Sequence, residues 1–251
     1  MQEEVTKKLN DLNRKFYEET AKHFDESRDY FWPGWEKLLP LLEDKKSPLK
    51  VLDVGCGNGR FGEFLHENLD TKISYTGLDS SPFLLEKAEE NLRNLEKLEN
   101  IELINSDILH FDFSQLPQKF DLIVLFGVLH HIPSRAKRTT LLKNLRELLA
   151  SLVPPLASHS YLVFSTWDFL DMKNIKHKII DWSEVDISSK QLEHGDYLLS
   201  WDRGVEALRY AHYFSDTDIE ELCREAGLQL IRSFSSDKKG DQYNKYFITS
   251  V

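Results

Sequence analysis

The stretch Val51-Leu-Asp-Val-Gly-Cys-Gly-Asn-Gly-Arg60 decides how this chain is expected to fold. A short apolar run passes through an acid into three glycines, and Leu and Phe then recur at helical spacing. This order predicts a buried strand, a tight turn and the first turn of a helix. Glycine suits the turn because the backbone must bend sharply and admit a ligand where a Cβ atom would collide. The stretch therefore predicts a nucleotide-binding loop.

Strand and helix patterns alternate along the rest of the chain. Strands that alternate with helices form right-handed βαβ units, so we expect an α/β fold with a doubly wound, Rossmann-like sheet. The sheet should have seven strands, mostly parallel, with an antiparallel C-terminal strand. The expected strands are 50–54, 73–78, 101–104, 120–126 and 161–166, and a closing pair 228–234 and 243–249 around a polar turn at 237–241. The expected helices are 1–30, 34–42, 61–69, 82–98, 137–152 and 216–226.

The composition is that of a globular enzyme without a membrane segment. No apolar run approaches the ~20 residues that span a bilayer, and the charged N-terminus lacks a signal-peptide core, so we expect a cytoplasmic protein. Cys56 and Cys223 form no Cys-x-x-Cys pair, which predicts neither a disulfide framework nor a metal site. The net charge of −10 argues against nonspecific binding to nucleic acid, DNA included, although a local basic patch can still dock a folded RNA.

Four interpretations of the glycine loop compete. A phosphate-binding P-loop needs Gly-Lys-Ser/Thr after its glycines, which Asn58-Gly-Arg-Phe61 does not supply. A dinucleotide loop needs G-x-G-x-x-G, whereas Gly55, Gly57 and Gly59 follow an acid as D-x-G-x-G-x-G. A loop without any ligand is disfavoured, because acids also end the next two strands. The fourth interpretation is a loop that binds S-adenosylmethionine.

The D-x-G-x-G-x-G pattern resembles the first motif of the class I S-adenosylmethionine-dependent methyltransferases. The resemblance covers residues ~50–167 and implies S-adenosylmethionine as cofactor. It implies that Asp79 binds both ribose hydroxyls and that Asp107 reads the adenine amino group. Asp53 either meets the methionine ammonium or braces the loop through backbone N–H groups. The cofactor-binding residues it implies are Tyr17, Asp53, Gly55, Cys56, Gly57, Asn58, Gly59, Asp79, Ser80, Asp107, Ile108, Phe126 and Gly127.

Three further segments are similar to the tRNA methyltransferases that esterify 5-carboxymethyluridine at the wobble position. The first runs from Phe16-Tyr17 through His23-Phe24 and Ser27-Arg28 to Trp32-Pro33. The second is a His-His loop at 130–131 with arginines at 135 and 138, and the third runs from Gly195 to Phe214. The order and approximate spacing match over nearly the whole chain. The segment 169–194 and the Ala at position 211 depart from the family pattern.

This narrower resemblance implies a substrate site. Arg28 and Arg209 are candidates to orient a carboxylate or to grip phosphate, with surface or interdomain salt bridges as the alternative. His131 takes a proton from a hydroxyl or amine acceptor, or orients a carboxylate by hydrogen bonding. The other candidates are Trp167, which could stack a base, Asp168 and His212, and each could instead belong to the core. Two basic clusters could bind phosphate or simply face solvent. The first comprises Arg135, Lys137, Arg138 and Lys143, and the second comprises Lys173, Lys176, His177 and Lys178.

We therefore expect a single methyltransferase domain over residues 1–251. Its parts are an N-terminal helical lid (1–47), a cofactor-binding core (48–168), a substrate-region insertion (169–213) and a C-terminal helix with a strand pair (214–251). The first expected substrate is the carboxylate of 5-carboxymethyluridine in tRNA. The alternatives are a small-molecule O- or N-methyltransferase and a non-catalytic cofactor-binding scaffold. The resemblance also implies a small activator subunit as a possible partner.

Overall fold

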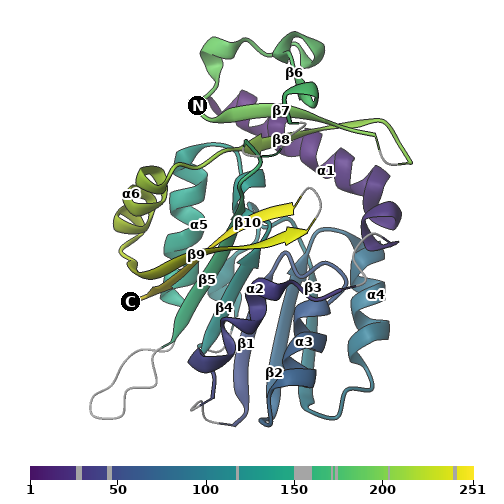
Figure 1. Cartoon of the computed structure of the whole chain (residues 1–251), viewed down its shortest axis with the longest axis vertical. Helices are drawn as coiled ribbons and strands as arrows, with labels where there is room; N and C mark the ends of the chain where they lie inside the picture. Colours follow the sequence, from purple (N-terminus) through teal and green to yellow (C-terminus); the bar gives the residue numbers. More distant parts are fainter. Residues whose placement is uncertain are drawn as a thin grey trace.

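The computed structural model describes residues 1–26, 30–43, 47–116, 119–149, 160–170, 172, 175–202, 204–239 and 242–251. Its main sheet holds seven strands, which Figure 1 shows between two layers of helices. These strands are β1 (Leu49–Val54), β2 (Ile73–Asp79), β3 (Leu98–Asn105), β4 (Leu122–Phe126), β5 (Tyr161–Trp167), β9 (Gln229–Lys239) and β10 (Gln242–Ser250). The α-helices are α1 (Glu3–Glu26), α2 (Pro33–Glu36), α3 (Arg60–Asn68), α4 (Pro82–Leu92), α5 (Arg135–Glu147) and α6 (Asp216–Ala226).

The strand order is β3-β2-β1-β4-β5-β10-β9. The first five strands are parallel, with Leu52 of β1 opposite both Thr76 of β2 and Ile123 of β4. Strand β10 runs antiparallel to β5 and to β9. Strands β1 and β4 are buried along nearly their whole length, as expected for parallel strands covered on both faces. The predicted seven-stranded sheet with an antiparallel C-terminal strand is confirmed.

Each face of the sheet has its own core. Leu52 and Leu125 pack on one face with residues of α5 and α6. Val51 and Val124 point to the other face, where Trp35 of α2 and Phe64 of α3 cover them. This alternation follows from the period of two along a strand. The strand ends therefore stand between two rigid layers and hold whatever lies at the carboxyl edge of the sheet.

The insertion forms a second sheet, which its irregular sequence does not predict. Strands β6 (Ile179–Ile180), β7 (Asp196–Trp201) and β8 (Ala207–His212) pair antiparallel in the order β6-β7-β8. Figure 1 shows this sheet above the main sheet, with α1 packed along β8. Its strands are short, and Leu198, Leu199 and Tyr210 are buried by tertiary contacts rather than by a regular alternation. Periodicity alone could not find such strands.

Several predicted boundaries are wrong, and in place of the helix expected over 34–42 the structure has the short α2 and a separate 3₁₀ turn, Leu39–Leu41. The helix expected over 82–98 ends at Leu92, and Leu98 instead begins β3, where it pairs with Ile73 of β2. Leu92, Leu95 and Leu98 keep an apolar spacing that continues the helical pattern through a turn, so pairing in the sheet overrides it. The polar turn expected over 237–241 includes Asp237, which is buried in β9. The helix expected over 137–152 runs from Arg135 to Glu147, and residues 150–159 lie outside the described part.

Within the described residues, every helix is either too short or too polar to cross a lipid bilayer.

Candidate active site

A cavity of about 170 Å³ opens at the carboxyl ends of β1, β2 and β4, beneath α1. Open α/β sheets bind ligands at this edge. Of the residues predicted to bind the cofactor, all but Gly59 line this cavity: Tyr17, Asp53, Gly55, Cys56, Gly57, Asn58, Asp79, Ser80, Asp107, Ile108, Phe126 and Gly127. His131 also lines it. The structure thus brings together residues from five separate segments of the chain.

The glycine loop is held open by its own backbone. The N–H groups of Gly55 and Cys56 donate to the carbonyl oxygen of Leu78, at 2.7 and 3.1 Å. Gly57 has a φ of +55°, and a Cβ added there would meet no atom within 4 Å, so this side of the loop is open. Gly59 serves helix packing instead. It is the N-cap of α3 with a φ of +80°, and a Cβ there would lie 2.9 Å from the Leu92 side chain, so it allows close helix packing.

Asp79 ends β2 and joins the loop to the next helix. Its Oδ2 accepts a hydrogen bond from the N–H of Gly57, and its Oδ1 accepts one from the N–H of Ser81, both at 2.9 Å. Burial raises the pKa of Asp79, while the backbone N–H groups that donate to it oppose the rise. The carboxylate is therefore fixed in orientation at the cavity wall, where it can accept hydrogen bonds from a diol.

Asp53 lies in β1 behind the loop and is almost fully buried. The hydroxyl of Tyr75 donates to its Oδ2 at 2.7 Å. Burial raises the pKa of Asp53 from 3.8 to about 7, and the Tyr75 hydrogen bond and Arg60 only partly oppose this. Asp53 is therefore poised to change charge near neutral pH, and a cation placed in the cavity would favour its ionised form.

Helix α1 covers the cavity with a polar edge that sequence reasoning missed except for Tyr17. Asn10, Asn13 and Tyr17 share one side of the helix at spacings of three and four residues. The Asn10 side chain donates to Asp107 Oδ2 at 2.9 Å, and the Asn13 side chain donates to the His131 carbonyl oxygen at 3.0 Å. Tyr17 packs edge-on against the His131 ring. Two asparagines beside an apolar helix stripe were the available signal, but nothing in the sequence says which strand ends they reach.

His131 sits in a short 3₁₀ turn, Leu129–His131, after β4. Its Nδ1 lies 3.0 Å from the carbonyl oxygen of Tyr210 in β8. A carbonyl oxygen only accepts hydrogen bonds, so Nδ1 carries the proton and a neutral ring has its lone pair on Nε2. His130 is buried, with its ring centroid 4.2 Å from that of His131 and 6.2 Å from that of Trp167.

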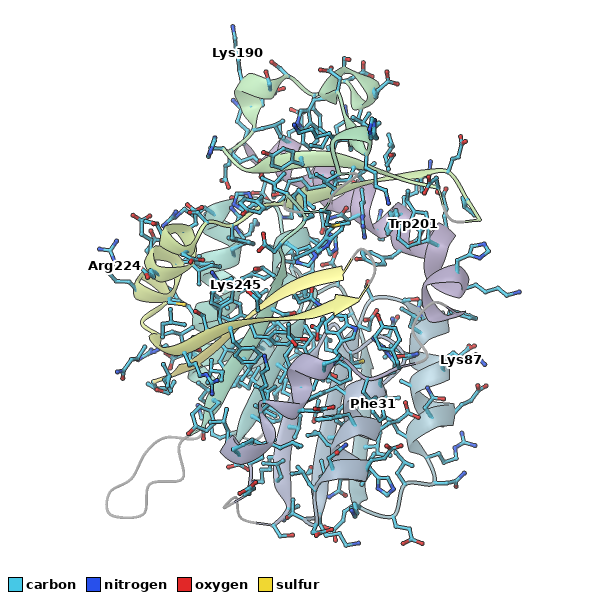
Figure 2. All side chains as sticks on the ribbon, viewed as in Figure 1. Phe31, Lys87, Lys190, Trp201, Arg224 and Lys245 are labelled. Carbon is cyan, nitrogen blue, oxygen red and sulfur yellow. The ribbon has the colours of Figure 1, made fainter. Side chains whose placement is uncertain are left out.

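Arg209 lies among aromatic rings on the other face of β8. Its guanidinium carbon is 4.4 Å from the ring centroid of Trp167, 5.2 Å from that of Phe16 and 5.4 Å from that of Trp201. Such contacts stabilise a cation where little water reaches it. Figure 2 shows Trp201 beside α1, at the end of the β7–β8 hairpin. Arg209 and Trp167 do not line the cofactor cavity, but through His130 they adjoin the turn that carries His131.

The remaining substrate candidates are dispersed. Asp168 follows β5, is half-buried and does not line the cavity. His212 also lies away from it, with its Nδ1 2.7 Å from Asp196 Oδ1. Arg28 and Lys173 fall outside the described residues.

The two arginines of the first basic cluster are engaged in ion pairs. Arg135 is ion-paired with Glu221 and Glu225, at 3.0 and 2.8 Å. Arg138 is only 2% exposed and is paired with Glu193 at 2.6 Å. Lys137 lies 3.0 Å from Glu3. Acids from distant segments thus already neutralise both arginines, which counts against the phosphate alternative.

Other cavity residues come from the segment before β1 and from α3. Trp32 and Trp35 are buried in the core and also line the cavity. Arg60 lines it as well, and its Nη1 donates to the Tyr30 carbonyl oxygen at 2.7 Å. Its guanidinium lies over both Trp rings, at 5.8 and 5.6 Å from their centroids. Arg60 follows the glycine loop directly, so its position in the motif was an available signal.

Comparison with known proteins places these features in context. The model of a family described as "Methyltransferase domain" matches residues 45–195. A protein of Encephalitozoon cuniculi named as a methyltransferase is 26% identical over 217 residues, covering 86% of this chain and 87% of that protein. The tRNA (carboxymethyluridine(34)-5-O)-methyltransferase of Schizosaccharomyces pombe is 26% identical over 231 residues, covering 87% and 89%.

Two further matches broaden this set. The ubiquinone biosynthesis O-methyltransferase of Thiobacillus denitrificans is 26% identical over 224 residues, covering 84% of this chain and 82% of that protein. The crystal structure of a SAM-dependent methyltransferase from Methanosarcina mazei superimposes with a TM-score of 0.62 at 17% identity, covering 88% of this chain and 97% of that one. At this identity the structural match speaks for the fold alone.

Proposed function

This chain belongs to the methyltransferase domain family, and from that premise we propose that it methylates the carboxylate of 5-carboxymethyluridine in tRNA. The coarser function is a methyltransferase that depends on S-adenosylmethionine. The observation that carries the finer proposal is the buried Arg209 guanidinium, held by three aromatic rings beside the turn of His131. A cation in such a place suits an anionic acceptor on a flat ring. The full-length similarity to the Schizosaccharomyces pombe enzyme supports the same acceptor.

The donor set of the cavity fits S-adenosylmethionine. Asp79 offers carboxylate oxygens for the two ribose hydroxyls, and Asp107 offers one for the adenine amino group. Asp53 suits the ammonium of the methionine part, and Arg60 suits its carboxylate. The open side of Gly57 lets the ligand approach the backbone. When bound, the cofactor supplies a methyl group on a sulfonium that a nucleophile takes by in-line displacement.

The chain's own task is mainly to position the acceptor. Orientation of reacting groups can lower a barrier by ~7–11 kcal/mol. A carboxylate is ionised at neutral pH and needs no general base. With Arg209 holding its charge, the acceptor needs only orientation at His131. Because the Tyr210 carbonyl engages Nδ1–H, His131 can donate to a carboxylate from Nε2 only when its ring is doubly protonated. A hydroxyl acceptor would instead need the lone pair on His131 Nε2 to remove its proton.

A second candidate function is an O-methyltransferase of small molecules. A second cavity lies between α1 and the β7–β8 hairpin, and its described lining carries three acids, Glu19, Asp202 and Glu206, against one cation, Lys15. Such a rim repels a phosphate backbone. The acidic lining of this second cavity and the ion pairing of Arg135 and Arg138 both favour a small acceptor over a polyanion. The Thiobacillus denitrificans relative points the same way.

The two functions separate in one experiment. The purified chain is incubated with S-adenosylmethionine and bulk tRNA from a strain lacking wobble methylation, and the nucleosides are then resolved by mass spectrometry. The tRNA proposal expects a methyl ester on 5-carboxymethyluridine, and less of it from Asp79→Ala at a subsaturating concentration of S-adenosylmethionine. A chain that methylates a quinol-like phenol but no tRNA fraction would instead support the second function. The activator subunit stays a prediction, tested by whether the ester forms with the chain alone.

A further inference from the structure

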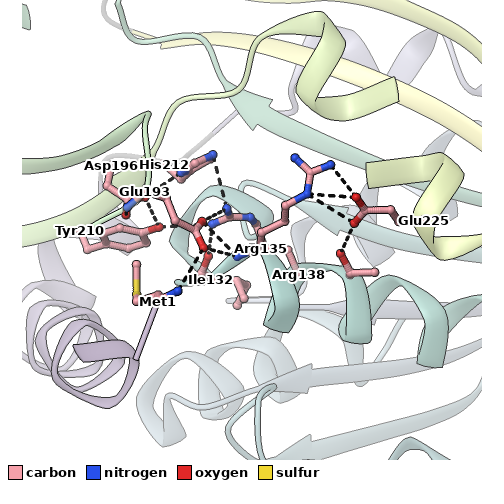
Figure 3. Close-up of polar contacts among 10 residues, drawn as sticks. Met1, Ile132, Arg135, Arg138, Glu193, Asp196, Tyr210, His212 and Glu225 are labelled. Carbon is pink, nitrogen blue, oxygen red and sulfur yellow. Dashed lines mark hydrogen bonds and ion pairs between the residues drawn. The ribbon is translucent and has the colours of Figure 1, made fainter. Parts of the chain in front are cut away.

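A buried polar cluster joins the small sheet to the turn that carries His131 (Figure 3). We call Arg138, Glu193, Asp196, Tyr210 and His212 the β8 cluster. The Tyr210 hydroxyl donates to Asp196 Oδ1 at 2.8 Å and accepts from Arg138 Nη1 at 3.3 Å. His212 Nδ1 lies 2.7 Å from the same Asp196 oxygen. The N–H of Glu193 donates to Asp196 Oδ2 at 2.8 Å, so both carboxylate oxygens are engaged.

The β8 cluster is an ion-pair network rather than a metal centre. Ligand atoms of Glu193, Asp196 and His212 lie within 4.8 Å of one another, which alone would suit a metal ion. Two cations already lie beside them: the Arg138 guanidinium, whose Nη2 is 2.6 Å from Glu193 Oε2 and 3.5 Å from His212 Nε2, and the amine of Met1, 4.0 Å from Glu193 Oε1. Burial lowers the pKa of His212 against the Asp196 hydrogen bond, so this ring is neutral and donates through Nδ1. The charges of the cluster are therefore balanced without a metal ion.

Two routes lead from the β8 cluster to His131. In the first route, the backbone carbonyl oxygen of Tyr210 accepts a hydrogen bond from His131 Nδ1–H, 3.0 Å away. Through Arg138, Nη1 donates to the carbonyl oxygen of Ile132 at 2.9 Å, one residue beyond His131. Asn13 ties both sides together, because its Oδ1 accepts from the Tyr210 N–H at 2.8 Å while its Nδ2 donates to the His131 carbonyl oxygen.

We propose that Tyr210, Asp196 and Arg138 form a positioning unit that fixes the orientation and tautomer of His131 at the cofactor cavity. The inference rests on the proposed function in taking His131 as the group beside the acceptor. The Tyr210 ring is fully buried and anchored at its hydroxyl, so the backbone of β8 has little room to move. The carbonyl of Tyr210 then keeps the proton on His131 Nδ1 and the lone pair on Nε2. A shift of β8 would weaken this hydrogen bond and allow the proton to occupy either nitrogen of the His131 ring.

The test uses the full chain with labelled histidine and S-adenosylhomocysteine as the bound probe. Nitrogen–proton correlation spectra report which ring nitrogen of His131 is protonated, and His131→Gln assigns the signal. Wild type is expected to show the Nδ1–H tautomer. Tyr210→Phe and the isosteric Asp196→Asn are expected to give a mixture of tautomers. Activity on tRNA should fall roughly 10- to 100-fold in kcat, while KM for S-adenosylmethionine changes less than about twofold.

The matched control is Tyr246→Phe, since Tyr246 also donates a buried hydroxyl to an aspartate, Asp237, at another place in the fold. It is expected to leave the His131 tautomer unchanged. The proposal is overturned if His131 keeps a pure Nδ1–H tautomer in both cluster variants and their kcat falls no further than in the control. If Tyr210→Phe does not fold, Asp196→Asn decides. If wild type methylates no tRNA, the proposed function fails, but the tautomer result still decides this inference.

Discussion

Asp79 contributes both to the shape of the cavity and to its hydrogen-bonding capacity. It orders the glycine loop through Gly57, receives the N–H of Ser81 and presents its carboxylate to the cavity. Local sequence was enough to find it, because an acid directly after a buried strand must lie at the carboxyl edge of the sheet. The same holds for Asp107, whose strand runs parallel to that of Asp79.

We expect Asp79→Ala to weaken S-adenosylmethionine binding by about 10- to 100-fold, since hydrogen bonds to a charged group are worth about 1.5–3 kcal/mol. Titration calorimetry measures this directly. Asp79→Asn keeps one acceptor oxygen and should lose less. Equal affinity of Asp79→Ala and wild type would remove the ribose assignment.

Asp53 predicts a pH dependence. Its pKa in the folded chain is raised to about 7 by burial, so a cationic ammonium beside it binds better as Asp53 ionises. Cofactor affinity should therefore rise between about pH 6 and pH 8, and Asp53→Asn should flatten the profile. The stability of the apo chain moves the other way. Between about pH 3.8 and 7, the native state keeps a proton on Asp53 that the unfolded chain has already released. The contribution of Asp53 to the free energy of unfolding is therefore fully present below pH 3.8 and is lost as the pH rises through about 7.

At the scale of elements, α1 covers the cavity through hydrogen bonds to residues that are distant in sequence. Asn10 and Asn13 bond to residues 97 and 118 positions away, so no local pattern could assign their partners. The same reason hid β6–β8 and the ion pairs of Arg135 and Arg138, which depend on acids in other elements. The main sheet was predictable because its strands are locally apolar and regularly spaced by helices.

We expect Asn10→Ala to loosen α1 from Asp107. Cofactor dissociation, followed by stopped-flow fluorescence, should become several-fold faster, because a lost hydrogen bond is worth about 1 kcal/mol. Amide hydrogen exchange in α1 should rise with it. Lys7→Ala changes an exposed residue of the same helix and serves as control. Unchanged dissociation in Asn10→Ala would mean that α1 does not hold the cofactor in.

The β9–β10 hairpin fixes α2 through Asp237. This buried carboxylate accepts from the Gly34 N–H at 2.8 Å, from the Asn244 side chain at 3.0 Å and from the Tyr246 hydroxyl. Asp237→Ala leaves three buried donors without an acceptor and should lower the free energy of unfolding by about 2–4 kcal/mol in urea titrations. Asp70→Ala, a fully exposed site, should cost less than ~0.5 kcal/mol. Similar losses in both variants would contradict the role of Asp237.

At the scale of the whole molecule, the cavity lies at the carboxyl edge of the main sheet, and α1 with the small sheet lies above that sheet (Figure 1). The first part could be predicted from sequence because its acids and glycines follow strands directly. The second could not, because Trp32, Asn13 and Tyr210 come from segments that meet only after folding. Under the proposed function, the acceptor is therefore selected by the part of the molecule that is less predictable from sequence.

The most direct test of the central claim uses S-adenosylmethionine with a trideuterated methyl group and tRNA lacking wobble methylation. The account predicts that a trideuteromethyl ester forms on 5-carboxymethyluridine, and that mild alkali releases the label as methanol. A deuterated product that resists alkali would place the methyl group on nitrogen, carbon or an ether oxygen. Such a product, or no labelled nucleoside from a chain that binds the cofactor, would contradict the account.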